Sequence, residues 1–302
     1  MSSVDINGCL YYSTVLYLWY NNEADAFVCL CVIFGENEMT VRVLMMNTGF
    51  SLFGSVHLFW IAVCILLTAF ILHAKVSPRV IALSALLLHL LQCADRMLNG
   101  TYGMDTLPLH ICSISTYLVF IHGFCFIGNP VEEHDPGRRL PESVSANAPC
   151  SRRRLSPREI IGEILFFPGL PGAFAAILFP NWTDAHPFSV LSVTGFLSHL
   201  AIGLYVLAAI RNGTLRPSLR HSYVPVLFLA LYAAVMIPYD RHFLMNYGFL
   251  YGPSPGSPLV FIAEIFGYGA GYYIGYALLA ALAMLLCYGL AAFARTFLKI
   301  TI

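Results

Sequence analysis

The chain has 302 residues, of which 58% are hydrophobic and only 11% charged, and its formal net charge is zero. A soluble domain of this composition would have too little polar surface, and a nucleic-acid partner would require a concentrated basic face. We therefore expect an all-α fold, a polytopic bundle of transmembrane helices.

Residues 1–48 are the poorest fit to this expectation. Their apolar stretches, at 10–20 and 27–34, are separated by polar residues, and each is shorter than the roughly 20 residues that a helix needs to cross the hydrocarbon. We expect a peripheral N-terminal segment at 1–48, followed by a membrane domain at 49–302.

Seven runs in the membrane domain are long and apolar enough to span a bilayer. They are 53–72, 80–98, 107–127, 160–179, 188–210, 222–239 and a final run within 259–296. The fourth contains Pro168-Gly169 and Pro171-Gly172, and the seventh contains Gly267, Gly269 and Gly271. A continuous hydrogen-bonded helix does not tolerate either pattern, so spans four and seven are predicted to be broken.

The positive charges predict an orientation. With the N-terminus outside and the C-terminus cytoplasmic, 13 of the 16 Lys and Arg residues lie on the cytoplasmic side, and only Arg42, Arg96 and Arg241 lie outside. Six of the Arg residues belong to 129–158, a segment with five Pro residues that reads as a mobile cytoplasmic loop. We expect a multi-pass protein of the plasma (cytoplasmic) membrane.

Polar residues gather at the predicted outer ends of the spans, where they are costly unless paired or hydrated. Asp95 is expected to pair with Arg96 or Arg241. Their convergence suggests a pocket open to the outer leaflet, while ordinary interfacial polarity is the alternative. The members are His57, Asp95, Arg96, His110, Cys112, Asp184, His186, Asp240, Arg241, His242 and Asn246. Glu163 lies within span four and needs a partner or a proton.

Cys112, near the start of the third span, is the candidate nucleophile. His110 lies about 200° away around a regular helix, so a base would have to come from another span, with His199 and His57 as candidates. A lone Cys in a span is more often a packing residue. The nine Cys residues include no CxxC, which predicts neither a disulfide framework nor a zinc site. We predict no metal and no cofactor.

Several short motifs match a known family in order and spacing over residues 49–290. The chain resembles the YwaF-like bacterial membrane proteins, which are related to the eukaryotic transmembrane protein 164 family. The matching pieces are Phe53-Gly54 with His57, Leu107-Pro108-Leu109-His110-Ile111-Cys112, Pro168-Gly169 with Pro171-Gly172-Ala173, Leu178 and Pro180, Ser198-His199, and Asn246-Tyr247-Gly248-Phe249-Leu250.

The resemblance implies a helical membrane protein and, on its eukaryotic side, a cysteine-dependent acyltransferase acting on ether phospholipids. The chain departs from the family pattern at three points. Gly248 stands where Met is usual, Gly267 to Ala270 replace Gly-Pro-Trp-Pro, and Cys112 follows its neighbouring His instead of preceding it.

Three functions remain open from the sequence. The first is a phospholipid acyltransferase or lipid hydrolase, with Cys112 as nucleophile and His199 or His110 as base. In this hypothesis His57, Arg96, Gly169, Asn246 and Tyr247 bind substrate, Gly169 or Asn246 also stabilising an oxyanion. The second is a transporter or channel for a small solute, and the third a non-catalytic lipid-binding protein. Membrane phospholipid is the expected environment and possible substrate, and the oligomeric state is left open.

Overall fold

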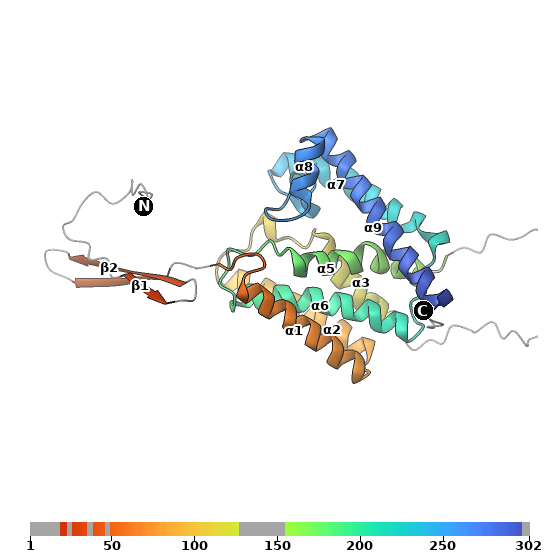
Figure 1. Ribbon diagram of the computed structural model, residues 1–302, viewed down its shortest axis with the longest axis horizontal. Coiled ribbons are helices and arrows are strands. Elements are labelled where there is room, and N and C mark those ends of the chain that lie inside the picture. The colour runs from red at the N-terminus through yellow and green to blue at the C-terminus, as the bar shows by residue number, and fades with distance from the viewer. Residues whose placement is uncertain (1–18, 23–25, 35–38, 46–48, 127–154, 298–302) are drawn as a thin grey trace, which may run out of the picture.

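The computed structural model describes residues 19–22, 26–34, 39–45, 49–126 and 155–297. The first three ranges form the strands β1 (Trp19–Asn22), β2 (Ala26–Phe34) and β3 (Met39–Met45), which pair antiparallel in the order β1-β2-β3 (Figure 1). In this register Trp19 pairs with Cys29, and Val28 pairs with Met45. The sequence did not predict these strands. Residues 129–154 of the predicted cytoplasmic loop lie outside the described residues.

The membrane domain is an all-α polytopic bundle, as predicted. Six helical segments are long and apolar enough to cross a membrane, and α3 is a shorter apolar helix of 15 residues. The segments are α1 (Ser55–His73), α2 (Pro78–Leu98), α3 (Ile111–Cys125), the combination of α4 (Pro157–Ile164), η2 (Leu165–Gly169) and α5 (Leu170–Leu178), then α6 (Val190–Arg211), α7 (Tyr223–Phe243), and α8 (Leu259–Phe266) with α9 (Ala270–Phe297). Short 3-10 turns are η1 (Met104–Thr106), η3 (Leu219–His221) and η4 (Tyr247–Phe249).

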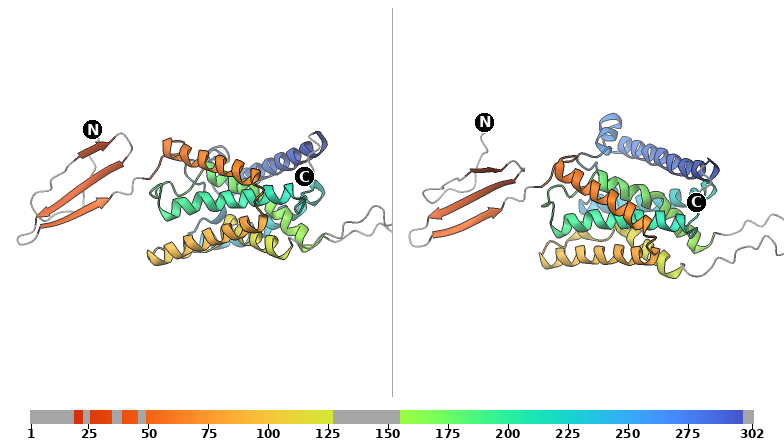
Figure 2. Two further views of the ribbon diagram at one scale, coloured as in Figure 1. Left: turned by 90° about the horizontal axis from the view of Figure 1, so that it is seen from below. Right: turned by 60° about the horizontal axis from the view of Figure 1, so that its bottom comes forward.

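Helix α6 lies at the centre of the bundle and contacts α1, α2, α3 and α5 (Figures 1 and 2). Small buried residues such as Gly195, Ala201 and Gly203 let these neighbours approach closely, which is how helices associate in lipid. In contrast, α7 and α9 lie to the other side of α5, where α7 packs on α4 and α9 packs on η2 (Figure 1).

Both predicted helix breaks are present. In span four Phe167 has φ −145° and ψ 120°, the Phe167–Pro168 peptide is cis, and the chain passes through a π-turn. The opened backbone is enclosed by protein, because Phe166 and Phe167 are buried and the Phe166 ring contacts Tyr288 at 5.0 Å. In span seven, α8 and α9 are separated by Gly267 and Gly269, whose φ angles of 74° and 73° suit glycine.

Helix α3 begins deeper in the bundle than the level at which its neighbour α2 ends. Gly123 packs against Ala82 near the inner ends of α3 and α2, so closely that a Cβ on Gly123 would lie 2.8 Å from the Ala82 Cβ. From this level α3 extends outward by roughly one turn less than α2 does. His110 and Cys112, at the start of α3, therefore lie within the layer formed by the other helices.

Candidate functional site

Three histidines from different parts of the chain lie in the same region of the bundle. We call His89 of α2, His110 before α3 and His199 of α6 the histidine cluster. His89 and His199 lie near the middle of their helices, and His199 is near enough to His89 and to His110 for their charges to interact. His110 and His199 are two of the residues that the sequence predicted for the site.

His199 is held in one orientation by its own helix and by an aromatic neighbour. Its Nδ1 donates to the Gly195 carbonyl at 2.6 Å, and its ring stacks on Trp182 with centroids 5.4 Å apart. Gly195 is required here because a Cβ would lie 2.8 Å from the Trp182 ring. A carbonyl only accepts, so Nδ1 bears the proton of the neutral ring and Nε2 bears a lone pair. No described residue hydrogen-bonds to that Nε2.

His89 lies beside a thiol of its own helix. The Cys93 Sγ lies 3.9 Å from the His89 Nε2, one helical turn away, and the Tyr117 ring meets the His89 ring edge-on at 5.4 Å. The i, i+4 spacing in α2 was the available signal for this contact. Cys93 is half-buried.

His110 is the N-cap residue of α3 and is partly enclosed. Its ring contacts the Tyr247 ring at 4.8 Å.

A second group of side chains lies beside the histidine cluster and includes Tyr247. We call Tyr232 of α7, Tyr247 of η4 and Tyr276 of α9 the tyrosine cluster. The Tyr247 hydroxyl donates to the Met104 carbonyl, and burial raises the pKa of Tyr247 to about 12. Tyr232 donates to the Leu109 carbonyl at 2.9 Å, and Tyr276 donates to the Gly248 carbonyl at 3.0 Å. These bonds tie α7 and η4 to the segment before α3, and they tie α9 to η4.

Cys112 lies next to the tyrosine cluster. It occupies the first turn of α3, is partly enclosed, and interacts electrostatically with the Tyr232 and Tyr276 phenols. Among the described residues no histidine nitrogen lies within hydrogen-bonding distance of its Sγ. The sequence had predicted that His110 and Cys112 point to different sides of α3. The contact between the His110 and Tyr247 rings connects the tyrosine cluster, next to Cys112, with the histidine cluster.

The ion pair predicted for Asp95 was wrong. Arg96 pairs with Asp105 at 3.9 Å, whereas Asp95 accepts a hydrogen bond from the Asn99 side chain at 3.1 Å. Asp105 lies in η1, between α2 and α3, and the turn brings it back over the end of α2. The sequence spacing suggested that Arg96 would pair with the adjacent Asp95. It does not show that the connecting loop brings Asp105 back toward Arg96.

Three residues that were predicted to bind substrate make contacts within the fold. His57 is fully buried and bonds at both ring nitrogens, to the Phe53 N–H and to the Ile177 carbonyl. The Asn246 amide closes its own loop by donating to the Gly252 carbonyl at 3.0 Å and accepting from the Tyr251 and Gly252 N–H groups. Gly169 is buried in η2, where a Cβ would lie 3.5 Å from the Ser115 Oγ.

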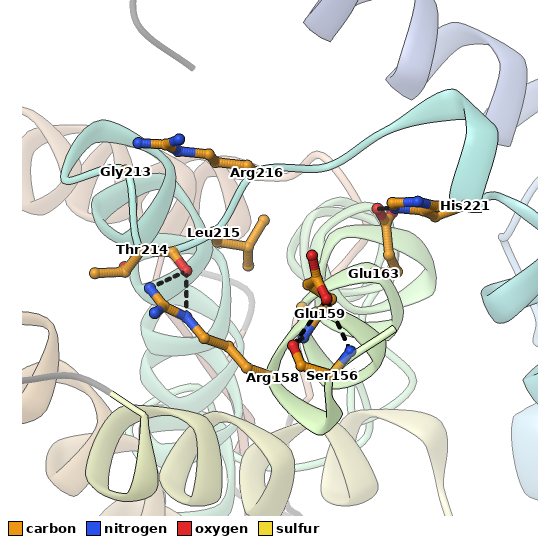
Figure 3. A pocket seen from close by; sticks show the side chains of 10 residues that line it. Ser156, Arg158, Glu159, Glu163, Gly213, Thr214, Leu215, Arg216 and His221 are labelled. Carbon is orange, nitrogen blue, oxygen red and sulfur yellow. Dashed lines mark hydrogen bonds and ion pairs between the residues drawn. The ribbon is translucent and has the colours of Figure 1, made fainter. Parts of the chain in front are cut away.

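A pocket of about 230 Å³ opens at the opposite ends of the helices, which the charge pattern predicts to be cytoplasmic (Figure 3). The sequence had predicted the pocket at the outer ends and did not associate these residues with one another. Glu163, which needed a partner, is buried beside this pocket and accepts hydrogen bonds from the Ser218 N–H at 2.8 Å and the Tyr288 hydroxyl at 2.6 Å. His221 Nδ1 lies 3.5 Å from the same carboxylate.

No three His, Cys, Asp or Glu side chains among the described residues form a metal site. The helices and the buried polar clusters define a multi-pass helical membrane protein. The chain belongs to the TMEM164 family, whose profile matches residues 41–288. This confirms the eukaryotic side of the resemblance found in the sequence, and the YwaF-like relationship stays a prediction. Comparisons with curated proteins and with solved structures gave no match.

Proposed function

We propose that this protein transfers or hydrolyses the acyl group of a membrane phospholipid, with a cysteine nucleophile and a histidine base near the outer leaflet of the cytoplasmic membrane. The resemblance to the TMEM164 family supplies the reaction class. The structure supports it with thiols, imidazoles and a cation that lie between the middle of the bundle and the end where α3 begins.

The orientation of His199 is the observation that supports the proposal most. Its Nδ1–H is occupied by the Gly195 carbonyl and its ring is fixed against Trp182, so the neutral imidazole presents Nε2 as a proton acceptor. A histidine that only filled space in a helix bundle would not need this second nitrogen to stay without a partner.

The proposed reaction begins with the thiol. A base removes the Cys112 proton, Sγ bonds to the ester carbonyl carbon, and the carbon–oxygen bond to glycerol breaks as the leaving oxygen takes the proton from the imidazole. Attack on the resulting thioester by a lysolipid hydroxyl gives a new ester, and attack by water gives a fatty acid. Each route regenerates the thiol.

Two thiols compete for the nucleophile's role. Cys112 is the proposed nucleophile, and Cys93 is the thiol beside an imidazole, 3.9 Å from the His89 Nε2. Arg96, whose side chain is 27% exposed, is proposed to hold the lipid phosphate, because a guanidinium binds phosphate oxygens in pairs. We do not assign Asn246 to the oxyanion, because its amide is used within its own loop.

The test uses purified protein in liposomes that contain a phospholipid with a labelled acyl chain and an unlabelled lysophospholipid. Label should move to the lysolipid, or to free fatty acid, at a rate that Cys112→Ala abolishes. Cys125→Ala is the matched control, because Cys125 is exposed at the other end of α3. Full activity in Cys112→Ala with loss in Cys93→Ala would move the role to Cys93; full activity in both would refute a cysteine mechanism.

The transporter hypothesis has less support. The broken backbone of span four, which would have to line its path, is packed against protein. A lipid-binding protein without catalysis would show retained lipid and no movement of label in the same liposomes.

A further inference from the structure

The cytoplasmic pocket is formed where three helices end. The N-terminal turn of α4, the connection after α6 and the η3 turn before α7 surround a volume of about 230 Å³. Helix ends of a multi-pass protein lie at the level of lipid headgroups. The pocket is thus a headgroup-level site on the side of the bundle opposite to the histidine cluster.

Charges of opposite sign line this pocket. Figure 3 shows Arg158 and Arg216 on one side, and Glu159 and Glu163, with His221, on the other. Leu215 is the apolar residue between the two sides. A ligand that carried a single sign of charge would meet repulsion from one of these walls.

Arg158 and Arg216 form the cationic side of the pocket. Arg158 donates through Nε and Nη2 to the Thr214 carbonyl, at 3.1 and 2.8 Å, which fixes the plane of the guanidinium. Within the described part of the chain, its Nη1 has no hydrogen-bond acceptor. Arg216 is exposed and has neither an ion pair nor a hydrogen bond with a described residue.

The anionic side is rigid and deeply placed. Glu163 is 3% exposed, and its two carboxylate oxygens are positioned by the Ser218 N–H and by the Tyr288 hydroxyl. Glu159 is fixed by the N–H and hydroxyl of Ser156, each at 2.8 Å. Two oriented carboxylates at one wall suit a cation with several N–H donors.

A second observation comes from His122, behind the pocket floor. This residue is fully buried, its Nδ1 bonds to the Tyr205 hydroxyl at 2.6 Å, and its Nε2 has no partner among the described residues. The Nε2 lies 3.8 Å from the position that a Cβ on Gly162 would take, and Gly162 lines the pocket. The orphaned nitrogen therefore lies next to Gly162, one of the residues that line the pocket.

We propose that this pocket binds a zwitterion composed of a phosphate and a primary ammonium, as in the headgroup of an aminophospholipid of the cytoplasmic leaflet. The phosphate lies between Arg158 and Arg216, and the ammonium donates to Glu163 and Glu159. The phosphate then meets guanidinium groups and the ammonium meets carboxylates, which offsets the cost of removing the ligand's charges from water. The site is separate from that of the proposed acyl transfer and does not depend on it.

The test measures lipid retention by native mass spectrometry of the purified full chain, after addition of phosphatidylethanolamine, phosphatidylglycerol or phosphatidylcholine. Phosphatidylethanolamine should be retained best, since phosphatidylglycerol lacks the ammonium and phosphatidylcholine has no N–H donors. Arg216→Gln should weaken retention roughly tenfold, as expected for one charge-assisted contact. Arg220→Gln is the control, because Arg220 is an exposed arginine of the same face outside the pocket.

Free phosphoethanolamine, measured by calorimetry with the same variants, identifies the source of the ligand. Binding of the free compound without retention of the lipid would assign the same chemistry to a soluble ligand. The proposal is overturned if neither compound binds, if Arg220→Gln weakens binding as much as Arg216→Gln, or if phosphatidylglycerol binds as tightly as phosphatidylethanolamine. Glu163→Gln, checked for an unchanged unfolding temperature, should remove the preference for phosphatidylethanolamine over phosphatidylcholine.

Discussion

His57 of α1 is joined to Ile177 of α5 by a hydrogen bond of 2.9 Å from its Nε2 to the carbonyl oxygen, at a site with no exposure to solvent. Its Nδ1 accepts from the Phe53 N–H, also at 2.9 Å. Both nitrogens are therefore committed, and the Ile177 carbonyl, in the last turn of α5, gains a donor that its own helix does not supply.

Replacing His57 should reduce stability without affecting catalysis directly. His57→Phe keeps the ring volume but leaves the Phe53 N–H and the Ile177 carbonyl without this partner, which should cost about 2–4 kcal/mol. Thermal unfolding in detergent would measure the loss. His73→Phe, at the exposed end of the same helix, should change the unfolding temperature little.

Gly248 should not accept the methionine that the family pattern favours. Its φ is 61°, and a Cβ would lie 2.9 Å from the Tyr232 ring, so Gly248→Met should lower the unfolding temperature. Tyr232→Ala should restore part of that loss, because the tyrosine ring occupies the space that the side chain needs. Gly252→Ala, where no atom lies within 4 Å, is the control. Equal unfolding temperatures for Gly248→Met and the parent protein would contradict this account.

His199→Gln should separate the base from its structural surroundings. The glutamine amide can still donate to the Gly195 carbonyl, but it offers no imidazole to accept a proton, so acyl transfer should fall by about 10²–10⁴-fold. The unfolding temperature should change by only a few degrees. Activity within a factor of two of the parent would remove His199 from the proposed mechanism.

Trp182→Phe tests the stacking contact with His199. The Trp182 Nε1 is buried and has no hydrogen-bond partner among the described residues, so removing it eliminates an unsatisfied donor while the ring is kept. Stability should therefore stay within about 1 kcal/mol of the parent value. A much larger loss would mean that the indole makes contacts beyond the described residues.

Most of the fold was predictable because bilayer thickness limits the length of a span and because proline and glycine interrupt helices locally. Span four and its break at Phe167–Pro168 followed from these rules alone. Contacts between elements were not predictable in this way. Arg96 meets Asp105 through a turn, and Glu163 meets Tyr288 across 125 positions of sequence, so neither appears in a periodic pattern.

The sequence indicated which residue types to expect at the candidate site, but it did not indicate the contacts between them. His110, His199 and Cys112 were chosen because ionisable and nucleophilic groups are rare near hydrocarbon. The pairing of Cys93 with His89 and the orientation of His199 depend on rotamers and on Gly195, which one-dimensional spacing does not determine. The cytoplasmic pocket was missed because its residues come from segments that are separate in sequence.

Helix α9 has 28 residues, and only 6% of the residues in its apolar stretch are buried within the protein, against 72% in that of α6. At 1.5 Å per residue α9 is about 42 Å long, more than the roughly 30 Å of a typical hydrocarbon layer, so it must tilt to match its surroundings. Bilayer thickness thus acts on this protein chiefly through α9. Since α9 supplies Tyr276 beside Cys112 and Tyr288 beside Glu163, a change in acyl-chain length would be transmitted to both ends of the molecule.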